Sequence, residues 1–379
     1  MLNSDLTANN SIKNSISELI QEMSHKSQEV KKIAICISIF SRYEGASRSA
    51  ENQAKELSER GYSVTIFTFF SNISSDDFKI NIIKPVIPIN DNFLNLIYRG
   101  LFPFNVIDLV RFIPKFKDFD FIIIHHNTFS ILSYFAQKIY GTKVIFYNHH
   151  IADGFESNKE FFFKNIYLKC VTPIHWNIIR QFDQVVSVSL YSKNCLFQKT
   201  CLESVVIYNR IDYNRFSNNL DKNIVRERYR IFDSPLILFV GRVLPHKGVH
   251  ILIDAFKIVK NEIPNAQLII VGKHYENDYS NKLKTKKDSS IFFVENVSDE
   301  DLPFYYAACD VYATCSLLEG FNMPLVEAQA CGKPVVAFNI GPHKEVVKNG
   351  FLVKENDTKE FGNTLIKVIN NIRGNKSVQ

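Results

Sequence analysis

Apolar and polar positions along the chain alternate between short runs rich in Val, Ile and Phe and longer stretches with helical spacing. Short β-branched runs separated by helical segments are typical of parallel sheets covered by helices. The pattern therefore predicts an α/β fold with two series of strands. The first series comprises Ile33–Ile39, Val64–Phe69, Phe121–His125, Lys143–Tyr147 and Val185–Val188, and the second Leu236–Val240, Gln267–Val271, Ile291–Val294, Val311–Ala313 and Pro334–Phe338.

Helical spacing, with apolar residues recurring every three or four positions, predicts the helices between these strands. The expected helices are Ser49–Arg60, Phe161–Phe182, Val249–Lys260 and Asp357–Ile372. A further apolar segment, Leu101–Ile113, is interrupted by Pro103, Asp108 and Arg111. We interpret this segment as one helix that is either buried or lies on a surface.

The two series of strands predict two Rossmann-like domains. We expect a polar N-terminal arm over residues 1–30, a first domain over 31–208, a linker over 209–233, a second domain over 234–355, and a C-terminal helix and tail over 356–379. Parallel sheets of this kind bind ligands outside the carboxyl ends of their strands. Two such domains that face each other would form an interdomain cleft for one ligand.

Composition narrows the class of protein. The 379 residues are too many for one ordinary core and fit two domains. A net charge of +6 does not predict a nucleic-acid partner, but it suits phosphorylated ligands or an anionic membrane face. The seven cysteines include no CxxC pair, residues 1–30 hold no apolar signal segment, and no apolar run is long enough to span a membrane. We therefore expect a cytoplasmic protein with reduced thiols.

The segment from Glu319 to Glu327 carries the strongest chemical signal. It follows an expected strand and opens a helix, with Asn322 at the N-cap position and Pro324 in the first turn. Free N–H groups at a helix start suit a phosphate, while the two carboxylates can accept hydrogen bonds from sugar and ribose hydroxyls. The alternative is that both acids only favour the helix start. We assign donor binding also to Gly320, Phe321, Asn322 and Leu325.

A second motif lies at the end of the first strand of the second series. There Gly241 is followed by Arg242, Lys247 and Gly248, just before the next expected helix. An arginine guanidinium can donate two parallel hydrogen bonds to a diphosphate, and a lysine ammonium adds a point charge. Gly241 allows a ligand to approach the backbone closely. Isolated cations in loops are more often solvated surface residues.

In this order the two motifs resemble those of the family 4 retaining glycosyltransferases, over about residues 31–355. The segments 206–212, 186–189 and 341–353 are also similar to the family's motifs. The resemblance implies the GT-B fold, with Glu319 and Glu327 binding a nucleotide-sugar donor and with Arg242 and Lys247 gripping its diphosphate. The family usually has further C-terminal helices that cross back to the first domain, and after Val353 this chain supplies one helical segment.

In the first domain, Gly45 lies in the loop that resembles the family's glycine-rich loop and is expected to line the phosphate side of the cleft. Glu44 replaces the family's first glycine, and Ser47 replaces its acidic residue. His149 resembles the family histidine that faces the reacting sugar, and we assign it a catalytic role together with Glu319. The alternative is a structural histidine packed against neighbouring loops.

A metal site is a further interpretation of the histidine pairs His125-His126 and His149-His150. No acidic or thiol ligand accompanies them at suitable spacing, so we expect no metal and no other cofactor. Asp118-Phe119-Asp120 matches the Asp-x-Asp pattern of metal-dependent sugar transferases. Because it precedes a strand, we interpret it as a solvated turn.

The resemblance implies an enzyme that transfers a sugar, with retention at the anomeric carbon, from a UDP- or GDP-linked donor to a glycan or lipid-linked acceptor. Assembly of a cell-surface polysaccharide or glycolipid is the expected setting. A nucleotide-sugar epimerase, a phosphorylase and an inactive binding subunit remain alternatives. The apolar and basic stretch Leu96–Phe116 adds a hypothesis of peripheral contact with the inner membrane face, against the alternative of a helix packed on its sheet.

Overall fold

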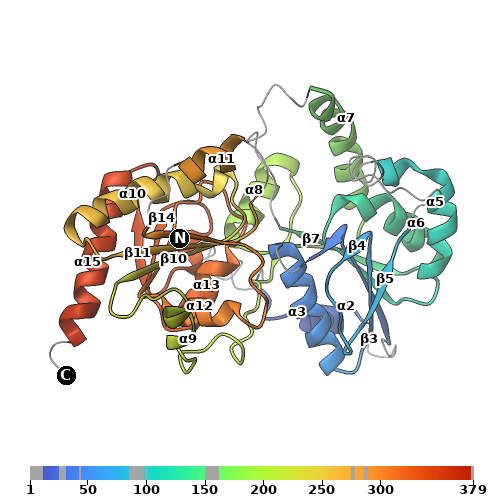
Figure 1. Cartoon of the computed structure of the whole chain (residues 1–379). Helices are drawn as coiled ribbons and strands as arrows, with labels where there is room; N and C mark the ends of the chain where they lie inside the picture. The colour runs from blue at the N-terminus through green and yellow to red at the C-terminus, as the bar shows by residue number, and fades with distance from the viewer. Residues whose placement is uncertain are drawn as a thin grey trace, which may run out of the picture. The chain divides into compact units, whose positions relative to one another are not determined.

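The computed structural model describes residues 12–24, 31–41, 44–84, 98, 101–149, 162–274, 278–285 and 289–376. Contacts divide the chain into two compact units, Met1–Arg210 and Ile211–Gln379. Figure 1 shows that each unit is built on a parallel sheet with helices along its faces. Within the described residues, no helix combines the length and the apolar character needed to cross a bilayer.

The main sheet of the first unit has seven described strands in the order β5-β3-β1-β6-β7-β8-β9. These are β1 Lys32–Cys36, β3 Ser63–Thr68, β5 Lys79–Ile82, β6 Phe121–Ile124, β7 Lys143–Asn148, β8 Gln184–Ser187 and β9 Val205–Val206. All the pairings are parallel, and β1 and β6 lie side by side at the centre of the sheet. The expected strand Ile33–Ile39 is in fact divided, because Ile39–Phe40 (β2) pairs with Phe70–Ser71 (β4) in a separate small sheet.

The helices of the first unit bury apolar side chains against this sheet. They are α2 Ile16–Met23, α3 Gly45–Glu59, α5 Val106–Phe112, α6 Ser130–Tyr140, α7 Phe162–Ile179 and α8 Leu190–Thr200, with 3-10 turns η1 Phe102–Phe104, η2 Ile113–Phe116 and η3 Asn127–Phe129. The core is rich in phenylalanine: Phe67 packs on Phe116, and Phe69 stacks on Phe129. Such ring pairs add to the stability gained from buried apolar area.

The second unit has a six-stranded parallel sheet in the order β12-β11-β10-β13-β14-β15. Its strands are β10 Leu236–Val240, β11 Gln267–Val271, β12 Ile291–Val294, β13 Val311–Thr314, β14 Val335–Phe338 and β15 Gly350–Val353. Its helices are α9 Asn223–Arg228, η5 Pro245–Lys247, α10 Val249–Glu262, α11 Asp278–Thr285, α12 Leu302–Ala308, α13 Met323–Ala330, α14 His343–Val346 and α15 Thr358–Lys376. This strand order is that of a Rossmann fold, with the switch point between β10 and β13.

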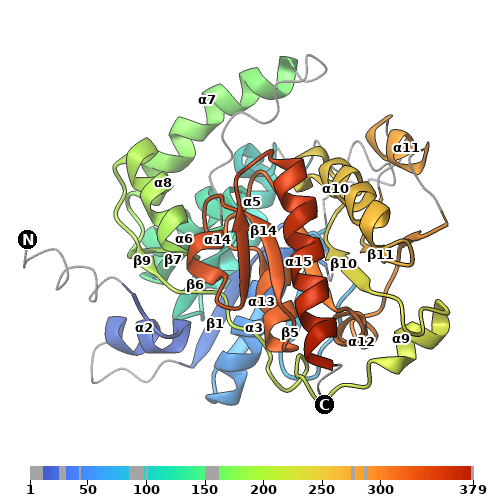
Figure 2. The same cartoon turned by 90° about the vertical axis from the view of Figure 1, so that its left-hand side faces the viewer.

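The C-terminal helix α15 stays with the second unit. Figure 2 shows it beside α10, and apolar residues of both helices share one buried core. The helix predicted over Asp357–Ile372 is therefore present and extends four residues further, to Lys376.

The segment expected as one helix over Leu101–Ile113 is in fact interrupted. Asn105 separates η1 from α5 and caps α5 by accepting a hydrogen bond from the backbone N–H of Asp108. Pro103 and Pro114 each lie at the start of a 3-10 turn. Proline lacks the N–H that a helix interior requires, so each of these turns starts a new piece, and the extended backbone of Asn105 ends η1 before α5 begins.

Both segments expected to lie outside the domains instead pack onto them. Within the expected N-terminal arm, α2 packs against α3 and buries Ile16, Leu19 and Ile20. Within the expected linker 209–233, Asn209 is held by α3 of the first unit, whereas α9 packs on α12 of the second. The segment 209–233 has little apolar periodicity, yet it forms ordered structure because polar side-chain contacts hold it.

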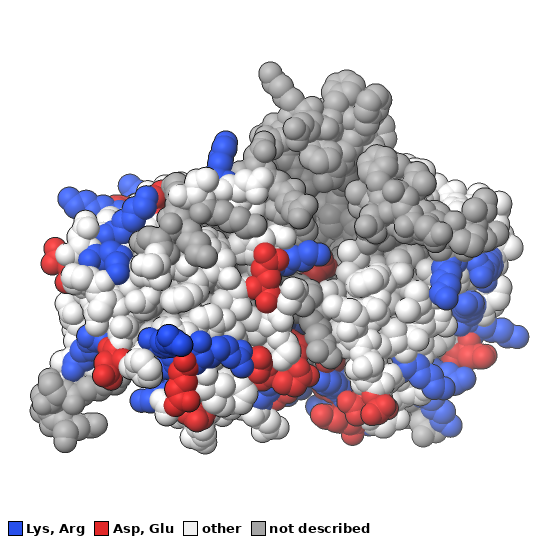
Figure 3. All heavy atoms as spheres, viewed as in Figure 1, with Lys and Arg blue, Asp and Glu red and all other residues white. Residues whose placement is uncertain are grey.

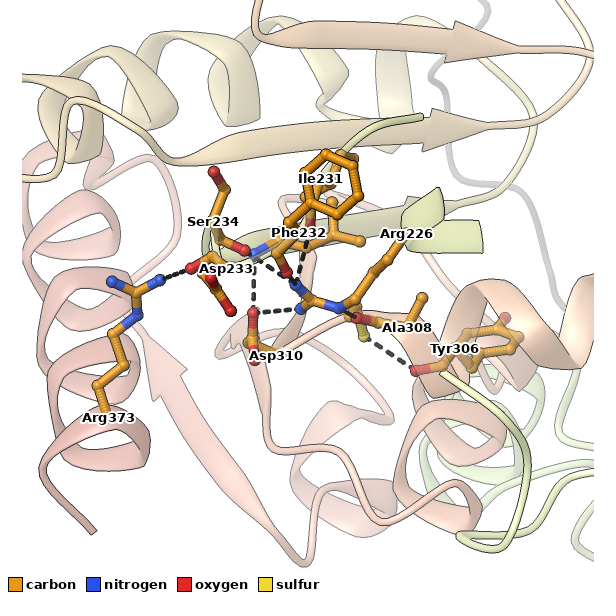
Figure 4. A network of polar contacts seen from close by, with 11 residues as sticks. Arg226, Ile231, Phe232, Asp233, Ser234, Tyr306, Ala308, Asp310 and Arg373 are labelled. Carbon is orange, nitrogen blue, oxygen red and sulfur yellow. Dashed lines mark hydrogen bonds and ion pairs between the residues drawn. The ribbon is translucent and has the colours of Figure 1, made fainter. Parts of the chain in front are cut away.

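Arg226 of α9 supplies many of those contacts (Figure 4). Its guanidinium donates to the carboxylate of Asp310 at 2.7 Å, and Asp310 also accepts from the backbone N–H of Leu236, where β10 begins. The same guanidinium donates to the backbone carbonyls of Ile231, Phe232, Ser234 and Ala308. One side chain thus fastens residues 223–234 to the sheet, because a guanidinium can donate five hydrogen bonds.

We predict that Arg226→Met lowers the free energy of unfolding of the second unit by about 3 kcal/mol, because it leaves Asp310 and several carbonyls without their donor. Arg228→Met on the same helix is the matched control. Its pair with Asp301 is nearly half exposed, so the loss should stay below about 1 kcal/mol. Urea unfolding followed by far-UV circular dichroism measures both, with Trp176 fluorescence reporting the first unit. Equal losses in the two variants would contradict the assignment.

Candidate functional site

The candidate site of the second unit lies at its switch point. Strands β10 and β13 are hydrogen-bonded neighbours, and the loops 241–248 and 315–322 follow their carboxyl ends. The backbone N–H of Leu317 donates to the carbonyl of His246 at 2.8 Å, which ties the loops together. At Gly248, with φ of +65°, an added Cβ would lie 2.0 Å from the carbonyl oxygen of Cys315. Only glycine permits this approach of the two loops.

The two loops bring Lys247 and Glu319 together. Lys247 Nζ donates to Glu319 Oε1 at 2.7 Å, and the side chains are only 19% and 9% exposed. Burial alone raises the pKa of Glu319, but the charge and hydrogen bond of Lys247, with smaller contributions from His343 and Ser316, hold it below its usual value. Glu319 is therefore an ionised carboxylate at neutral pH, next to a cation. The sequence predicted that these residues converge, and the structure confirms it.

Glu327 lies in α13 and is 1% exposed. Its Oε2 accepts a hydrogen bond of 2.6 Å from the hydroxyl of Tyr306 on α12. The tyrosine hydroxyl fixes the orientation of this carboxylate. Sequence reasoning missed Tyr306, because no motif connects α12 with the segment from Glu319 to Glu327.

The structure corrects the expected role of Asn322. It occupies the N-cap position of α13, but its backbone is left-handed, with φ of 72°, and its side chain makes no capping hydrogen bond. Instead the Asn322 amide donates to Nε2 of His343 at 2.9 Å, and Nδ1 of His343 donates to the carbonyl of Phe338 at 2.7 Å. Burial lowers the pKa of His343, so the ring is neutral and can act as both acceptor and donor. His343 lies in a motif that the sequence singled out, yet its role in the site was missed.

Two other predicted donor-binding residues belong to the core. The side chains of Phe321 and Leu325 are buried, and the backbone N–H of Leu325 already donates to the carbonyl of Asn322 at 3.2 Å. Their side chains therefore serve packing, and the N–H of Leu325 is not free for a phosphate. Gly320 lies in the loop just before them and is partly exposed.

The backbone is crowded at Gly241, directly after β10. An added Cβ at Gly272, which follows β11, would lie 1.9 Å from the carbonyl oxygen of Gly241. The close approach of these strand ends positions the half-buried Arg242 at the mouth of the sheet. Sequence reasoning identified Gly241 and Arg242 but not Gly272, because a close approach between distant segments leaves no local pattern.

In the first unit, His149 follows β7 and lies against His125, which follows β6. Nε2 of His149 is 2.7 Å from Nδ1 of His125, and Nε2 of His125 is 3.1 Å from Oε1 of Gln53 on α3. Burial, with a smaller contribution from neighbouring His126, lowers the pKa of His149 to about 3. Gly45 begins α3 and has open space around it, so no neighbour requires a glycine there.

The remaining candidate ligands have structural contacts. Nδ1 of His126 accepts from the backbone N–H of Ser38, and Asp120 accepts from those of Lys31 and Lys32. The segment is a partly exposed turn, as expected, and Asp120 fastens the start of β1 from it. His150 lies outside the described residues, and among those described no group of three or more His, Cys, Asp or Glu residues is arranged to hold a metal.

The structure thus forms two groups of predicted site residues, one in each unit. Lys247 lies with Glu319 in the second unit, and His149 lies with His125 in the first. The cleft expected between the two domains stays a prediction.

Comparisons with known proteins agree with this fold. Residues 43–215 match the family described as Glycosyltransferase Family 4, and residues 221–377 match Glycosyl transferases group 1. An uncharacterised glycosyltransferase of Methanocaldococcus jannaschii is 32% identical over 192 residues, so the chain spans about half the length of that relative. The Escherichia coli UDP-Gal:alpha-D-GlcNAc-diphosphoundecaprenol alpha-1,3-galactosyltransferase is 26% identical over 291 residues, 70% of each chain. The solved structure of Anabaena HepE with UDP-glucose has a TM-score of 0.68 at 22% identity and covers 91% of this chain and 90% of that chain.

The fold and the two family matches class the chain as a glycosyltransferase of the GT-B type. They confirm the resemblance to the family 4 glycosyltransferases that the motifs predicted.

We predict that acid destabilises the first unit through three histidines with lowered pKa values, the buried His125 and His175 and the half-buried His149. Burial lowers all three pKa values, that of His175 to about 4. Below about pH 6.5 the unfolded chain binds protons that the folded chain does not, so the free energy of unfolding falls as pH drops. The slope should be about 1.4 kcal/mol per pH unit for each histidine. Urea unfolding followed by Trp176 fluorescence at pH 7 and pH 5 measures it.

His175→Leu isolates one of the three groups. The variant should lose less stability than the wild type on passing from pH 7 to pH 5. A wild-type stability that is unchanged or higher at pH 5 would contradict the burial of neutral histidines.

Proposed function

We propose that the chain transfers a sugar, with retention at the anomeric carbon, from a UDP- or GDP-linked donor to a glycan or lipid-linked acceptor. The observation that carries this proposal is the contact between Lys247 and Glu319, 2.7 Å apart at the carboxyl ends of adjacent strands. Open parallel sheets bind nucleotides at this position. A half-buried cation beside a half-buried carboxylate offers one group to a phosphate and the other to a sugar hydroxyl.

The donor would bind on the second unit. Arg242 and Lys247 hold the diphosphate, Glu319 accepts from a sugar hydroxyl, and Glu327, held by Tyr306, accepts from the ribose. In this proposal the diphosphate competes with Glu319 for the ammonium of Lys247. When the ammonium turns to the diphosphate, Oε1 of Glu319 becomes free to accept a hydrogen bond from a sugar hydroxyl.

The reaction breaks the bond between the anomeric carbon and the diphosphate oxygen and forms one to an acceptor oxygen. The acceptor's proton passes to the leaving phosphate, and negative charge develops on that phosphate. Fixed cations aimed at developing charge stabilise a transition state more than a ground state. Because Arg242 and Lys247 supply this charge, the proposal includes no catalytic metal and no other cofactor.

Two relatives support the choice of substrates. The HepE structure contains UDP-glucose, and the Escherichia coli relative is named for a UDP-Gal donor and a diphosphoundecaprenol-linked acceptor. Figure 3 shows acidic and basic side chains interspersed on the visible face, which does not resemble an extended basic surface for nucleic acid. We therefore propose a nucleotide sugar and a glycan or glycolipid as partners.

We predict that Lys247→Met and Glu319→Gln each lower kcat/KM by about 100-fold or more, because each removes a group that stabilises the transition state. The measurement is release of nucleoside diphosphate from a panel of UDP- and GDP-sugars, with lipid-linked and free glycans as acceptors. Lys257→Met on α10 is the matched control, since its pair with Asp254 is also short, at 2.9 Å, but exposed. It should change the rate less than two-fold.

Turnover at wild-type rate by both site variants would overturn the site. Release that depends on acceptor separates a transferase from an epimerase, which needs no acceptor, and from a phosphorylase, which needs free phosphate. An inactive subunit would bind the donor without release.

We further propose that α5 rests on the inner face of an anionic membrane. Val106, Ile107 and Val110 are 67%, 69% and 67% exposed on this one short helix. Arg111 and Lys115 flank them, and their charge complements anionic headgroups.

The triple variant Val106→Ser, Ile107→Ser and Val110→Ser should lose most of its flotation with phosphatidylglycerol vesicles. Phe232→Ser is the control, because Phe232 is equally exposed but belongs to the second unit. Wild-type protein that fails to float, or flotation of all three proteins alike, would contradict this surface.

A further inference from the structure

A hydrogen-bonded chain of buried and half-buried side chains leads to His149. Ser49 Oγ donates to Asn209 Oδ1 at 2.7 Å, and the amide nitrogen of Gln53 donates to Ser49 Oγ at 3.3 Å. Gln53 Oε1 lies 3.1 Å from Nε2 of His125, whose Nδ1 lies 2.7 Å from Nε2 of His149. Helix α3 supplies Ser49 and Gln53 one turn apart, and β6 and β7 deliver the two histidines as neighbouring strands.

The direction of each hydrogen bond follows from its partner. The hydroxyl of Ser49 gives its single proton to Asn209, so it accepts from the amide nitrogen of Gln53. The oxygen of Gln53 then faces His125 and can only accept, which requires a proton on Nε2 of His125. A neutral His125 therefore has a bare Nδ1, and the bond to His149 requires a proton on Nε2 of His149.

Both rings are held in the neutral form. Burial lowers the pKa of His125 and His149, and the neighbouring histidines lower both further. The ring of Tyr147 stacks on His125 with centroids 5.2 Å apart, so an apolar face covers that imidazole. Each ring consequently carries one proton at neutral pH, and the chain decides on which nitrogen it lies.

We propose that Gln53 and His125 are positioning residues that fix His149 in its Nε2–H tautomer, so that Nδ1 is presented as an acceptor to a hydroxyl of a substrate. Among the described residues, Nδ1 of His149 has no hydrogen-bond partner. The inference rests on the proposed function for the identity of the substrate, whereas the tautomer does not depend on it. A substrate whose facing hydroxyl is replaced by hydrogen or fluorine can donate nothing to Nδ1 and reacts more slowly.

The first test reads the tautomer in the full-length chain without any substrate. Two-bond ¹H–¹⁵N spectra of protein labelled on histidine nitrogens distinguish a protonated from a bare ring nitrogen. We expect His149 with Nε2 protonated and Nδ1 bare, and a mixture of tautomers in Gln53→Leu. Lys55→Met changes a partly exposed residue of the same helix, outside the hydrogen-bonded chain, and should keep the wild-type tautomer. A proton on Nδ1 of His149 in the wild type, or no change in Gln53→Leu, overturns the positioning role.

The second test asks which ring nitrogen of His149 contacts the substrate. In His149→Asn the amide lies where Nδ1 was, and in His149→Gln it lies where Nε2 was. We expect kcat/KM of the Asn variant to exceed that of the Gln variant at least ten-fold, with thermal unfolding confirming that both fold. Equal losses overturn the contact through Nδ1. A wild-type chain without transferase activity defeats the proposed function, while the spectra still decide the tautomer.

Discussion

The candidate donor site depends on one contact, the largely buried pair of Lys247 and Glu319 where the loops after β10 and β13 meet. Two opposite charges out of water are costly unless they meet in good geometry, so this pair requires both loops to be held in place. The glycine at position 248 allows the two backbones to touch, and the hydrogen bond from Leu317 to His246 fastens them. The Rossmann strand order puts this contact at the switch point of the sheet, where a ligand can reach both charges.

Around that pair, side chains from distant elements hold the other polar groups in fixed orientations. Tyr306 fixes Glu327, and His343 fixes Asn322 in its left-handed conformation. In the first unit, His149 is oriented in the same way, by the hydrogen bond between its Nε2 and Nδ1 of His125. Polar groups oriented before the ligand arrives need little rearrangement during the reaction, which is how such sites stabilise developing charge.

The sequence predicted the parallel α/β fold, and each of the ten strands expected from apolar runs is present within a few residues. It also predicted the convergence of Lys247 and Glu319, since both follow buried strands and the family motifs place them in one site. Tyr306, Gln53 and Gly272 were missed because they act across elements far apart in the chain. Asn322 was misjudged because a local pattern gives the position of an N-cap but not its backbone angle. Strand β9 has only two residues, and such short pairings leave little pattern to detect.

Amide hydrogen exchange of the full chain, measured with and without nucleoside diphosphate sugars, reports whether a donor binds at the contact between Lys247 and Glu319. If the donor binds at the pair of Lys247 and Glu319, a UDP- or GDP-sugar slows amide exchange in the loops 241–250 and 315–326 together. One ligand that contacts both loops reduces the opening of both. Unchanged exchange in both loops with every UDP-, GDP- and ADP-sugar, or protection confined to another part of the chain, would contradict the site.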